Sequence, residues 1–170
     1  EILYKYGGIY IDADTYCLEK IDDLIMEEHL HYENEEKRPG LICNGFIFVK
    51  KNNHIMKKCI DTIKKIDNIN SKHPHLITGP IFLTEIVKKN NYNINILPSY
   101  TFLPYHYSNH IYKGTNKVYG IHYWGSTSLS NFNYNINHLY FPTIILDNMN
   151  INNNLFKFTK KINYLKDIPH

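Results

Sequence analysis

Two aspartates separated by one residue, Asp12 and Asp14, are the side chains of this sequence best suited to metal chemistry. They follow a pair of glycines and the apolar run 9–11, which predicts a short buried strand. Because alternate residues of an extended chain point the same way, both carboxylates are expected on one side, at the carboxyl end of that strand. Carboxylates placed there suit Mg²⁺ or Mn²⁺ facing a diphosphate. A bare Asp-x-Asp triplet is also a common turn, so it does not establish a metal site by itself.

A second stretch with chemical content runs from residue 118 to residue 126. A predicted strand there delivers His122 and the only tryptophan, Trp124, into a turn that contains Ser126. Imidazole is a common metal ligand, but a lone histidine in a strand is more often a packed residue, so the case for His122 depends on its neighbours. His29 and His31 are also spaced to bind a metal, yet no third ligand lies near them in the sequence.

The helices and strands expected around these residues predict an α/β fold. Residues 41–49 are nearly all apolar, as in a strand covered on both faces. The Asn44-Gly45 pair within it indicates either a bulge or a close approach to a ligand, to which Asn44 would offer its amide. The last turn of a helix is predicted at 2–4, and further helices are predicted at 21–28, 53–66 and 81–89. Short strands are predicted at 94–97, 101–103 and 143–146. A polar loop is predicted at 29–39 and a turn at 73–75. A terminal helix is predicted at 155–165.

The start of the predicted helix at 81–89 is a further candidate ligand contact. Gly79 and Pro80 precede it, and Pro80 fits the first helical position. Free N–H groups at a helix start bind anionic or hydroxylated ligands, although the motif is also simply how many helices begin.

Length and composition set broad limits. The 170 residues fit one domain, and the net charge of +3 gives no reason to expect a nucleic-acid partner. Three cysteines without CxxC spacing disfavour a disulfide framework and a zinc ribbon. There is no apolar run long enough to span a membrane and no signal-like start, so a cytoplasmic location is expected. Because the first residue is Glu1 and not Met, we expect the carboxyl-terminal portion of a longer polypeptide, inactive or unstable in isolation.

Four segments, in order, resemble glycosyltransferase family 32, the DXD-motif sugar transferases that include initiating mannosyltransferases and capsule-synthesis enzymes. They are GGIYIDAD at 7–14, NGFIF at 44–48, TGP at 78–80 and IHYWGS at 121–126. The resemblance implies a GT-A type α/β fold with a mostly parallel sheet. It implies one partial catalytic domain over 1–170, with a family-like core at 1–127 and a tail at 128–170, lacking the first nucleotide-binding βαβ part.

The resemblance also implies roles for individual residues. Asp12 and Asp14 match the catalytic, metal-binding aspartates, and His122 matches a block that completes the shell of a Mn²⁺ or Mg²⁺ ion. Substrate contacts are expected from residues in all four segments, namely Gly8, Tyr10, Asn44, Gly79, Pro80, Trp124 and Ser126. The implied partners are a UDP- or GDP-sugar donor and a glycan or protein hydroxyl acceptor, with retention of anomeric configuration.

Two other readings of the sequence stay open. One is a non-catalytic descendant that keeps the fold as a sugar-binding or scaffold subunit. The other is a nuclease or phosphatase with two metal ions, which requires additional clustered carboxylates. The acidic residues near Glu33 are predicted to lie in a polar loop, so they do not favour that reading.

Overall fold

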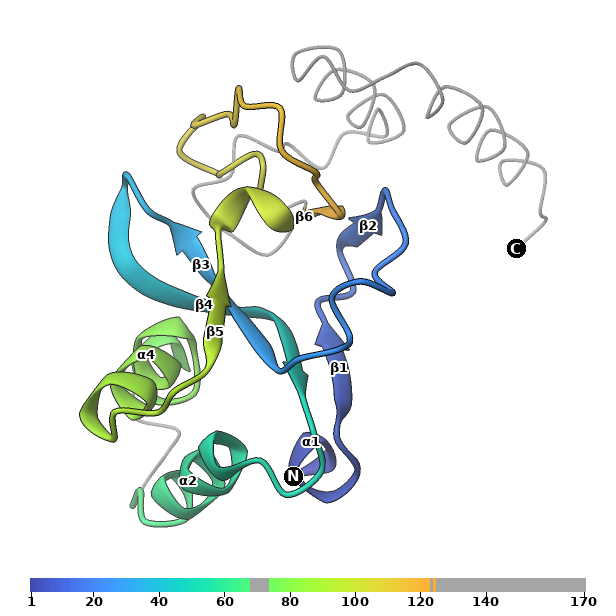
Figure 1. Cartoon of the computed structure of the whole chain (residues 1–170). Helices are drawn as coiled ribbons and strands as arrows, with labels where there is room; N and C mark the ends of the chain where they lie inside the picture. The colour runs from blue at the N-terminus through green and yellow to red at the C-terminus, as the bar shows by residue number, and fades with distance from the viewer. Residues whose placement is uncertain (68–73, 123, 125–170) are drawn as a thin grey trace, which may run out of the picture.

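The computed structural model describes residues 1–67, 74–122 and 124, which form a mixed α/β structure (Figure 1). Its main sheet has four strands in the order β1, β4, β3, β5. Their bounds are Gly8–Ile11 for β1, Arg38–Val49 for β4, His29–Asn34 for β3 and Asn95–Leu97 for β5. The α/β class is thus confirmed. The tail 128–170, with its expected strand at 143–146 and helix at 155–165, lies outside the described residues.

The sheet is mostly antiparallel in the part of the chain described. β1 pairs antiparallel with β4, β4 pairs antiparallel with β3, and β3 pairs parallel with β5. The expectation of a mostly parallel sheet is therefore wrong here. The reason is local, because only residues 35–37 connect β3 to β4, and such a short connection joins antiparallel strands.

The structure differs from two predictions, one just before the β3–β4 hairpin and one within it. Residues 22–26 form turns in place of the helix predicted at 21–28, and the predicted loop 29–39 contains all of β3. Buried polar side chains of β3 have partners: the His29 Nε2 lies 2.6 Å from the Leu24 carbonyl oxygen, and Glu33 pairs with Arg38 at 2.9 Å. Two ring nitrogens, His29 Nδ1 and His31 Nε2, are buried without one among the described residues. Tertiary partners, which composition does not reveal, make this segment a strand.

β1 is a strand, as predicted, but it is not buried. Ile9, Tyr10 and Ile11 are 39%, 45% and 44% exposed. β1 is an edge strand that pairs with β4 alone in the described sheet. Its apolar side chains therefore meet solvent in this structure, which corrects the prediction of a buried strand.

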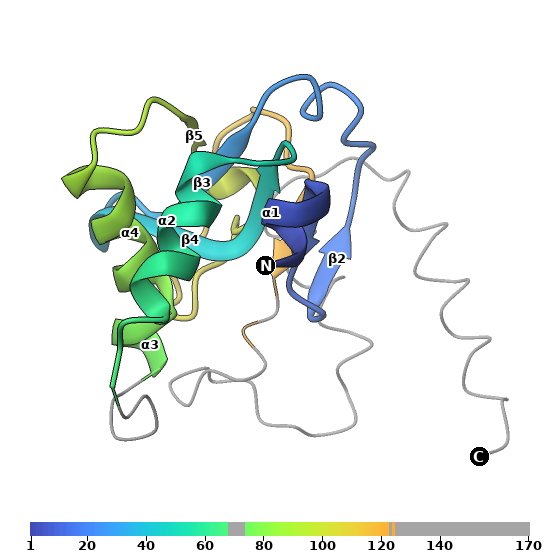
Figure 2. The same ribbon diagram turned by 90° about the horizontal axis from the view of Figure 1, so that it is seen from below.

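Helices α2 and α4 pack on the sheet, with α1 (Ile2–Tyr6) beside α2 (Figure 2). α2 spans His54–Ile63, and its predicted cap is confirmed because the Asn53 side chain accepts from the Met56 N–H at 3.0 Å. α4 spans Pro80–Lys89 with Pro80 in its first turn, also as predicted. A short helix, α3 (Pro74–Ile77), occurs where a turn was predicted at 73–75.

The main core lies between the sheet and these two helices. Its buried members are Leu30, Ile42, Ile47, Val49, Ile55, Met56, Phe82, Leu83, Ile86 and Val87. Full burial of a large apolar side chain stabilises the fold by about 1.5–3 kcal/mol. This core anchors β4 on both sides of Asn44 and Gly45, because Ile42 and Ile47 are both among its members.

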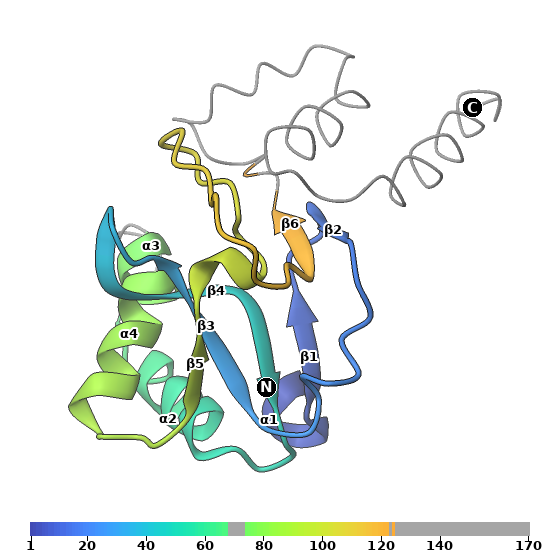
Figure 3. The ribbon, with the colours of Figure 1, turned by 45° about the horizontal axis from the view of Figure 1, so that its top comes forward.

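A two-stranded sheet of β2 (Thr15–Cys17) and β6 (Gly120–His122) lies beyond the end of β1 (Figure 3). Between β5 and β6 the chain contains a 3-10 helix, η2 (Ser99–Thr101). It overlaps the strand that was predicted at 101–103. The Phe102 ring stacks on Phe46 of β4 at 3.8 Å between centroids. The His122 N–H of β6 donates to the Phe102 carbonyl oxygen at 3.2 Å, so Phe102 joins the small sheet to the main one.

Two further predictions concern the membrane and the cysteines. In the described segments there is no helix of the length and apolarity that crossing a bilayer requires. Cys17, Cys43 and Cys59 are free thiols, which agrees with the absence of a disulfide framework.

Candidate metal centre

Asp12 and Asp14 lie in the tight turn that joins β1 to β2. The Thr15 N–H donates to the Asp12 carbonyl oxygen at 3.0 Å, which closes the turn. The Asp12 N–H donates to the Gly45 carbonyl oxygen at 2.9 Å, which ties the turn to β4. The aspartates are at the carboxyl end of β1 as predicted, but a turn, and not the pleat of an extended strand, brings their carboxylates together.

β4 bulges beside Asp12. Four residues of β4, 44–47, face the single residue Leu30 of β3 between two regular pairs. The bulge predicted at Asn44-Gly45 is therefore confirmed. A methyl group at Gly45 would lie 2.9 Å from the Asp12 Oδ2 atom, so the missing side chain lets β4 and this carboxylate approach each other.

His122 reaches the same place from the far end of the described chain. β2 and β6 pair antiparallel with Thr15 opposite His122. The His122 Nδ1 lies 3.4 Å from Asp14 Oδ1, 4.0 Å from Asp12 Oδ2 and 3.3 Å from the Thr15 hydroxyl. Figure 3 shows β6 alongside β2, above the end of β1. Strand pairing thus delivers an imidazole to the aspartate turn.

Trp124 packs directly against His122. The two rings meet edge to face at 4.7 Å between centroids and 88° between planes. The indole is 7% exposed, and its Nε1–H donates to the Tyr105 carbonyl oxygen at 2.8 Å. Its N–H is therefore already used within the protein, and the substrate contact expected of Trp124 stays a prediction.

Burial sets the charge state of His122. It lowers the pKa of the imidazole below 6.5, although Asp14 and Asp12 act in the opposite direction. The imidazole is therefore neutral at pH 7, and its contacts with the aspartates are not ion pairs there. Neutral imidazole is the form that binds metal ions.

Tyr10 orients one of the two carboxylates. Its hydroxyl donates to Asp12 Oδ1 at 2.7 Å. This hydrogen bond, with burial and the charges of Asp12 and Asp14, raises the pKa of Tyr10 to about 12. The tyrosine therefore remains a donor across the physiological range and leaves Asp12 Oδ2 directed toward His122.

The donor set fits a divalent cation. Ligand atoms of Asp12, Asp14 and His122 all lie within 4.8 Å of one another. The Asp12 and Asp14 side chains are 33% and 35% exposed, so the cluster opens to solvent on the carboxylate side. Two carboxylates and an imidazole suit Mn²⁺, and a six-coordinate ion would keep positions for phosphate oxygens and water. No second cluster of three such groups occurs among the residues described.

The other predicted substrate contacts are spread more widely. Gly8 begins β1, four residues and therefore about 13 Å of strand from Asp12. Gly79 and Pro80 begin α4, which lies apart from β2 and β6 in all three ribbon views. Asn44 is partly exposed in the bulge, and Ser126 lies outside the described residues. Their roles stay predictions.

Sequence reasoning did not single out Thr15, whose hydroxyl contacts His122. It also did not assign Glu33 and His106, which lie 3.5 Å apart and are almost fully buried. The position of Thr15, directly after Asp14 and at the start of a strand, was an available signal. The pairing of Glu33 with His106, 73 positions later, had none.

Comparison with known proteins agrees with this geometry. Residues 1–31 match the family model described as a glycosyltransferase sugar-binding region containing a DXD motif. This segment is similar to DXD glycosyltransferase regions. The resemblance inferred from the sequence is therefore confirmed, and both aspartates of the cluster lie inside the matched segment.

Two curated relatives extend the likeness beyond this DXD region. The chain is 32% identical over 105 residues to the O-glycosyltransferase braB of Annulohypoxylon truncatum, covering 52% of this chain and 25% of the relative. It is 34% identical over 91 residues to inositol phosphoceramide mannosyltransferase 3 of Schizosaccharomyces pombe, covering 50% of this chain and 24% of the relative. The chain thus spans about a quarter of the length of these relatives. No solved structure matches it.

Proposed function

We propose that this chain belongs to a metal-dependent glycosyltransferase of GT-A type that transfers a sugar from a nucleotide-diphosphate sugar to a hydroxyl group. The observation that supports this most strongly is the convergence of Asp12 and Asp14 with His122, which the β2–β6 pairing brings from the other end of the described chain. The match of residues 1–31 to a DXD sugar-binding region gives the cluster its chemical context.

The chemistry that such a cation supplies is neutralisation of the negative charge on the departing nucleoside diphosphate. Asp12 and Asp14 are the hard oxygen ligands for Mn²⁺ or Mg²⁺, and His122 adds a neutral nitrogen. Tyr10 engages Asp12 Oδ1 and so leaves Oδ2 for the ion. No described side chain is required to exchange a proton with the leaving group, because the metal carries the charge.

The substrate classes follow from the names of the relatives and from the bulge. One relative is named an O-glycosyltransferase and the other a mannosyltransferase. We extend this to a UDP- or GDP-sugar donor, a glycan or protein hydroxyl acceptor and a retaining outcome. Asn44 is our proposed acceptor contact near the metal, since its neighbour Gly45 borders the Asp12 carboxylate. Gly79 and Pro80 would act only on a longer acceptor.

Calorimetry separates this function from a non-catalytic sugar-binding subunit. Mn²⁺ is titrated into the protein, followed by UDP-glucose or GDP-mannose with and without the metal. A transferase site predicts donor binding that depends on Mn²⁺ and is lost in Asp14→Asn. Asp61→Asn is the matched control, because Asp61 is a surface aspartate paired with Lys57. Donor binding of equal affinity with and without Mn²⁺ would contradict the proposal.

The two-metal hydrolase reading gains no support from the described residues. Glu33, the candidate considered for a further carboxylate ligand, lies in β3 and pairs with Arg38. Its carboxylate is 3% exposed and is already neutralised. One cation site is thus what the described side chains offer.

A further inference from the structure

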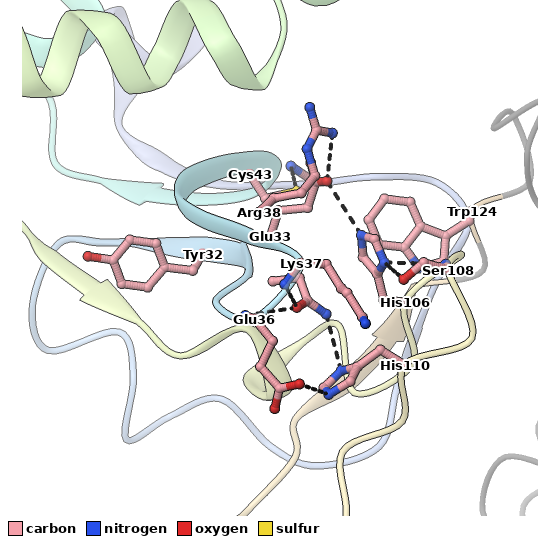
Figure 4. Close-up of polar contacts among 12 residues, drawn as sticks. Tyr32, Glu33, Glu36, Lys37, Arg38, Cys43, His106, Ser108, His110 and Trp124 are labelled. Atoms are coloured by element: carbon pink, nitrogen blue, oxygen red, sulfur yellow. Dashed lines mark hydrogen bonds and ion pairs between the residues drawn. The ribbon is translucent and has the colours of Figure 1, made fainter.

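A second polar cluster contacts Trp124 and connects the β3–β4 hairpin to the segment 104–112 (Figure 4). At its centre is Glu33, which is 2% exposed. The carboxylate accepts from the Arg38 Nη1–H at 2.9 Å, and its Oε1 lies 3.5 Å from the His106 Nε2. Burial would raise the pKa of Glu33, but His106 and Arg38 hold it below 4.5. A buried anion therefore faces the His106 ring.

His106 has one ring orientation in this cluster. The Ser108 N–H donates to Nδ1 at 3.3 Å, and the Ser108 hydroxyl lies 2.7 Å from the same atom. An Nδ1 that accepts a backbone hydrogen bond leaves the proton of the neutral imidazole on Nε2, which faces Glu33. The His106 side chain is 1% exposed, so both edges of the ring are fixed by protein groups.

The indole of Trp124 lies between this fixed histidine and the metal ligand. Its ring meets His106 at 5.1 Å and 77°, Tyr107 at 5.0 Å and 72°, and His122 at 4.7 Å and 88°. The hydrogen bond from its Nε1–H to the Tyr105 carbonyl oxygen holds the ring along another direction. A displacement of His106 therefore displaces the indole, and the indole in turn displaces the imidazole of His122.

We infer that Glu33 and His106 are positioning residues, which hold His122 in its metal-binding orientation through Trp124. This role rests on the proposed metal centre. The support of the ion then extends past the ligands themselves, to a buried contact between a carboxylate on β3 and a histidine of the segment 104–112. In metal sites, groups that orient a ligand in this way commonly alter metal affinity by about 10–100-fold when they are removed.

The same two segments supply a matched control pair. The His110 Nε2 lies 2.9 Å from Glu36 Oε2, again between the hairpin and the segment 104–112. This pair is more exposed, at 29% for His110 and 69% for Glu36. The control pair thus has the same kind of contact, between a glutamate and a histidine, and it joins the same two segments. It differs in lying at the surface.

Mn²⁺ affinity and tryptophan emission test the inference together. Free Mn²⁺ is measured by electron paramagnetic resonance, and Trp124, the only tryptophan, reports on its own surroundings. Glu33→Gln and His106→Gln are expected to weaken Mn²⁺ binding by about tenfold or more and to shift the emission. Glu36→Gln and His110→Gln are expected to leave affinity within about twofold of wild type. Far-ultraviolet circular dichroism verifies that each variant is folded.

Trp124→Phe tests the same path if the Glu33 or His106 variants do not fold. It keeps an aromatic ring beside His122 but removes the bond to Tyr105, and weaker Mn²⁺ binding is again expected. The positioning role would be overturned if Glu33→Gln and His106→Gln keep the wild-type Mn²⁺ affinity and emission, or if Trp124→Phe keeps the wild-type Mn²⁺ affinity. The proposed metal centre would remain intact in that case. A wild-type protein that binds no Mn²⁺ would overturn the metal centre and the positioning role with it.

Discussion

Thr15 and His122 face each other across the two strands β2 and β6, with the Thr15 hydroxyl 3.3 Å from the His122 Nδ1. Because Thr15 directly follows Asp14, this pairing determines how far the imidazole lies from the aspartate turn. A slip of one residue in the pairing would turn His122 to the opposite face of the small sheet. The geometry of the candidate metal centre therefore depends on strand register as much as on the ligands.

Replacement of His122 by alanine is expected to weaken Mn²⁺ binding by roughly 10–100-fold, because one of three protein ligands is lost. Isothermal titration calorimetry measures the affinity. His110→Ala is the control, since His110 is a partly exposed histidine that pairs with Glu36. Equal Mn²⁺ affinity in wild type and His122→Ala would reduce His122 to a packing residue.

Two glycine substitutions separate effects on the metal from effects on the fold. Gly45→Ala places a methyl group 2.9 Å from the flexible Asp12 carboxylate, so it is expected to lower Mn²⁺ affinity with little change in stability. Gly7→Ala places a methyl group 2.6 Å from the Lys51 backbone nitrogen, and Gly7 itself has a φ of +72°. Its strained backbone is expected to reduce the free energy of unfolding by about 1–3 kcal/mol.

Urea unfolding and Mn²⁺ titration on both glycine variants measure the two effects. A Gly45→Ala protein with unchanged Mn²⁺ affinity would show that the carboxylate of Asp12 adapts freely, or that it does not bind the ion. A stable Gly7→Ala protein would show that the turn before β1 tolerates a side chain.

Stability is expected to fall in mild acid because of His31. Burial lowers the pKa of His31 to about 4, and the backbone bond to Tyr32 only partly opposes this. The unfolded chain takes up a proton near the ordinary pKa of 6.5, whereas the folded chain does not until about pH 4. The contribution of His31 to the free energy of unfolding is therefore fully present above pH 6.5 and is lost as the pH falls toward 4.

Urea titrations at two pH values measure this loss. Between about pH 7.5 and about pH 5, His31 alone is expected to remove about 2 kcal/mol of the free energy of unfolding. His31→Phe is the control, because a phenyl ring suits the space between Phe46 and Phe102. If that variant keeps the full pH dependence, the acid sensitivity arises elsewhere.

Several structural features could be predicted from neighbouring residues in the sequence. Asn53 predicts the start of α2 because its side chain caps the first turn, and Pro80 predicts the start of α4. Glycine within an apolar strand predicts the bulge at Gly45. Each of these features depends on residues that are close together in the chain.

Features that depend on distant partners were missed. β3 was predicted to be a loop because Glu33 and its neighbours are polar, yet Arg38 and the distant His106 make burial of that carboxylate possible. β1 was predicted to be buried because Ile9 and Ile11 are apolar, yet the strand lies at the sheet edge. Composition gives the chemical type of a residue, whereas burial follows from which segments meet.

We propose above that Asp12, Asp14 and His122 bind one divalent cation. Anomalous diffraction from crystals of the protein grown with Mn²⁺ and a nucleoside diphosphate would locate this ion. We expect one manganese peak within about 2.0–2.5 Å of a carboxylate oxygen of each aspartate and of the His122 Nδ1. A map without manganese at these three residues, or with the ion bound elsewhere, would show that they do not form the cation site.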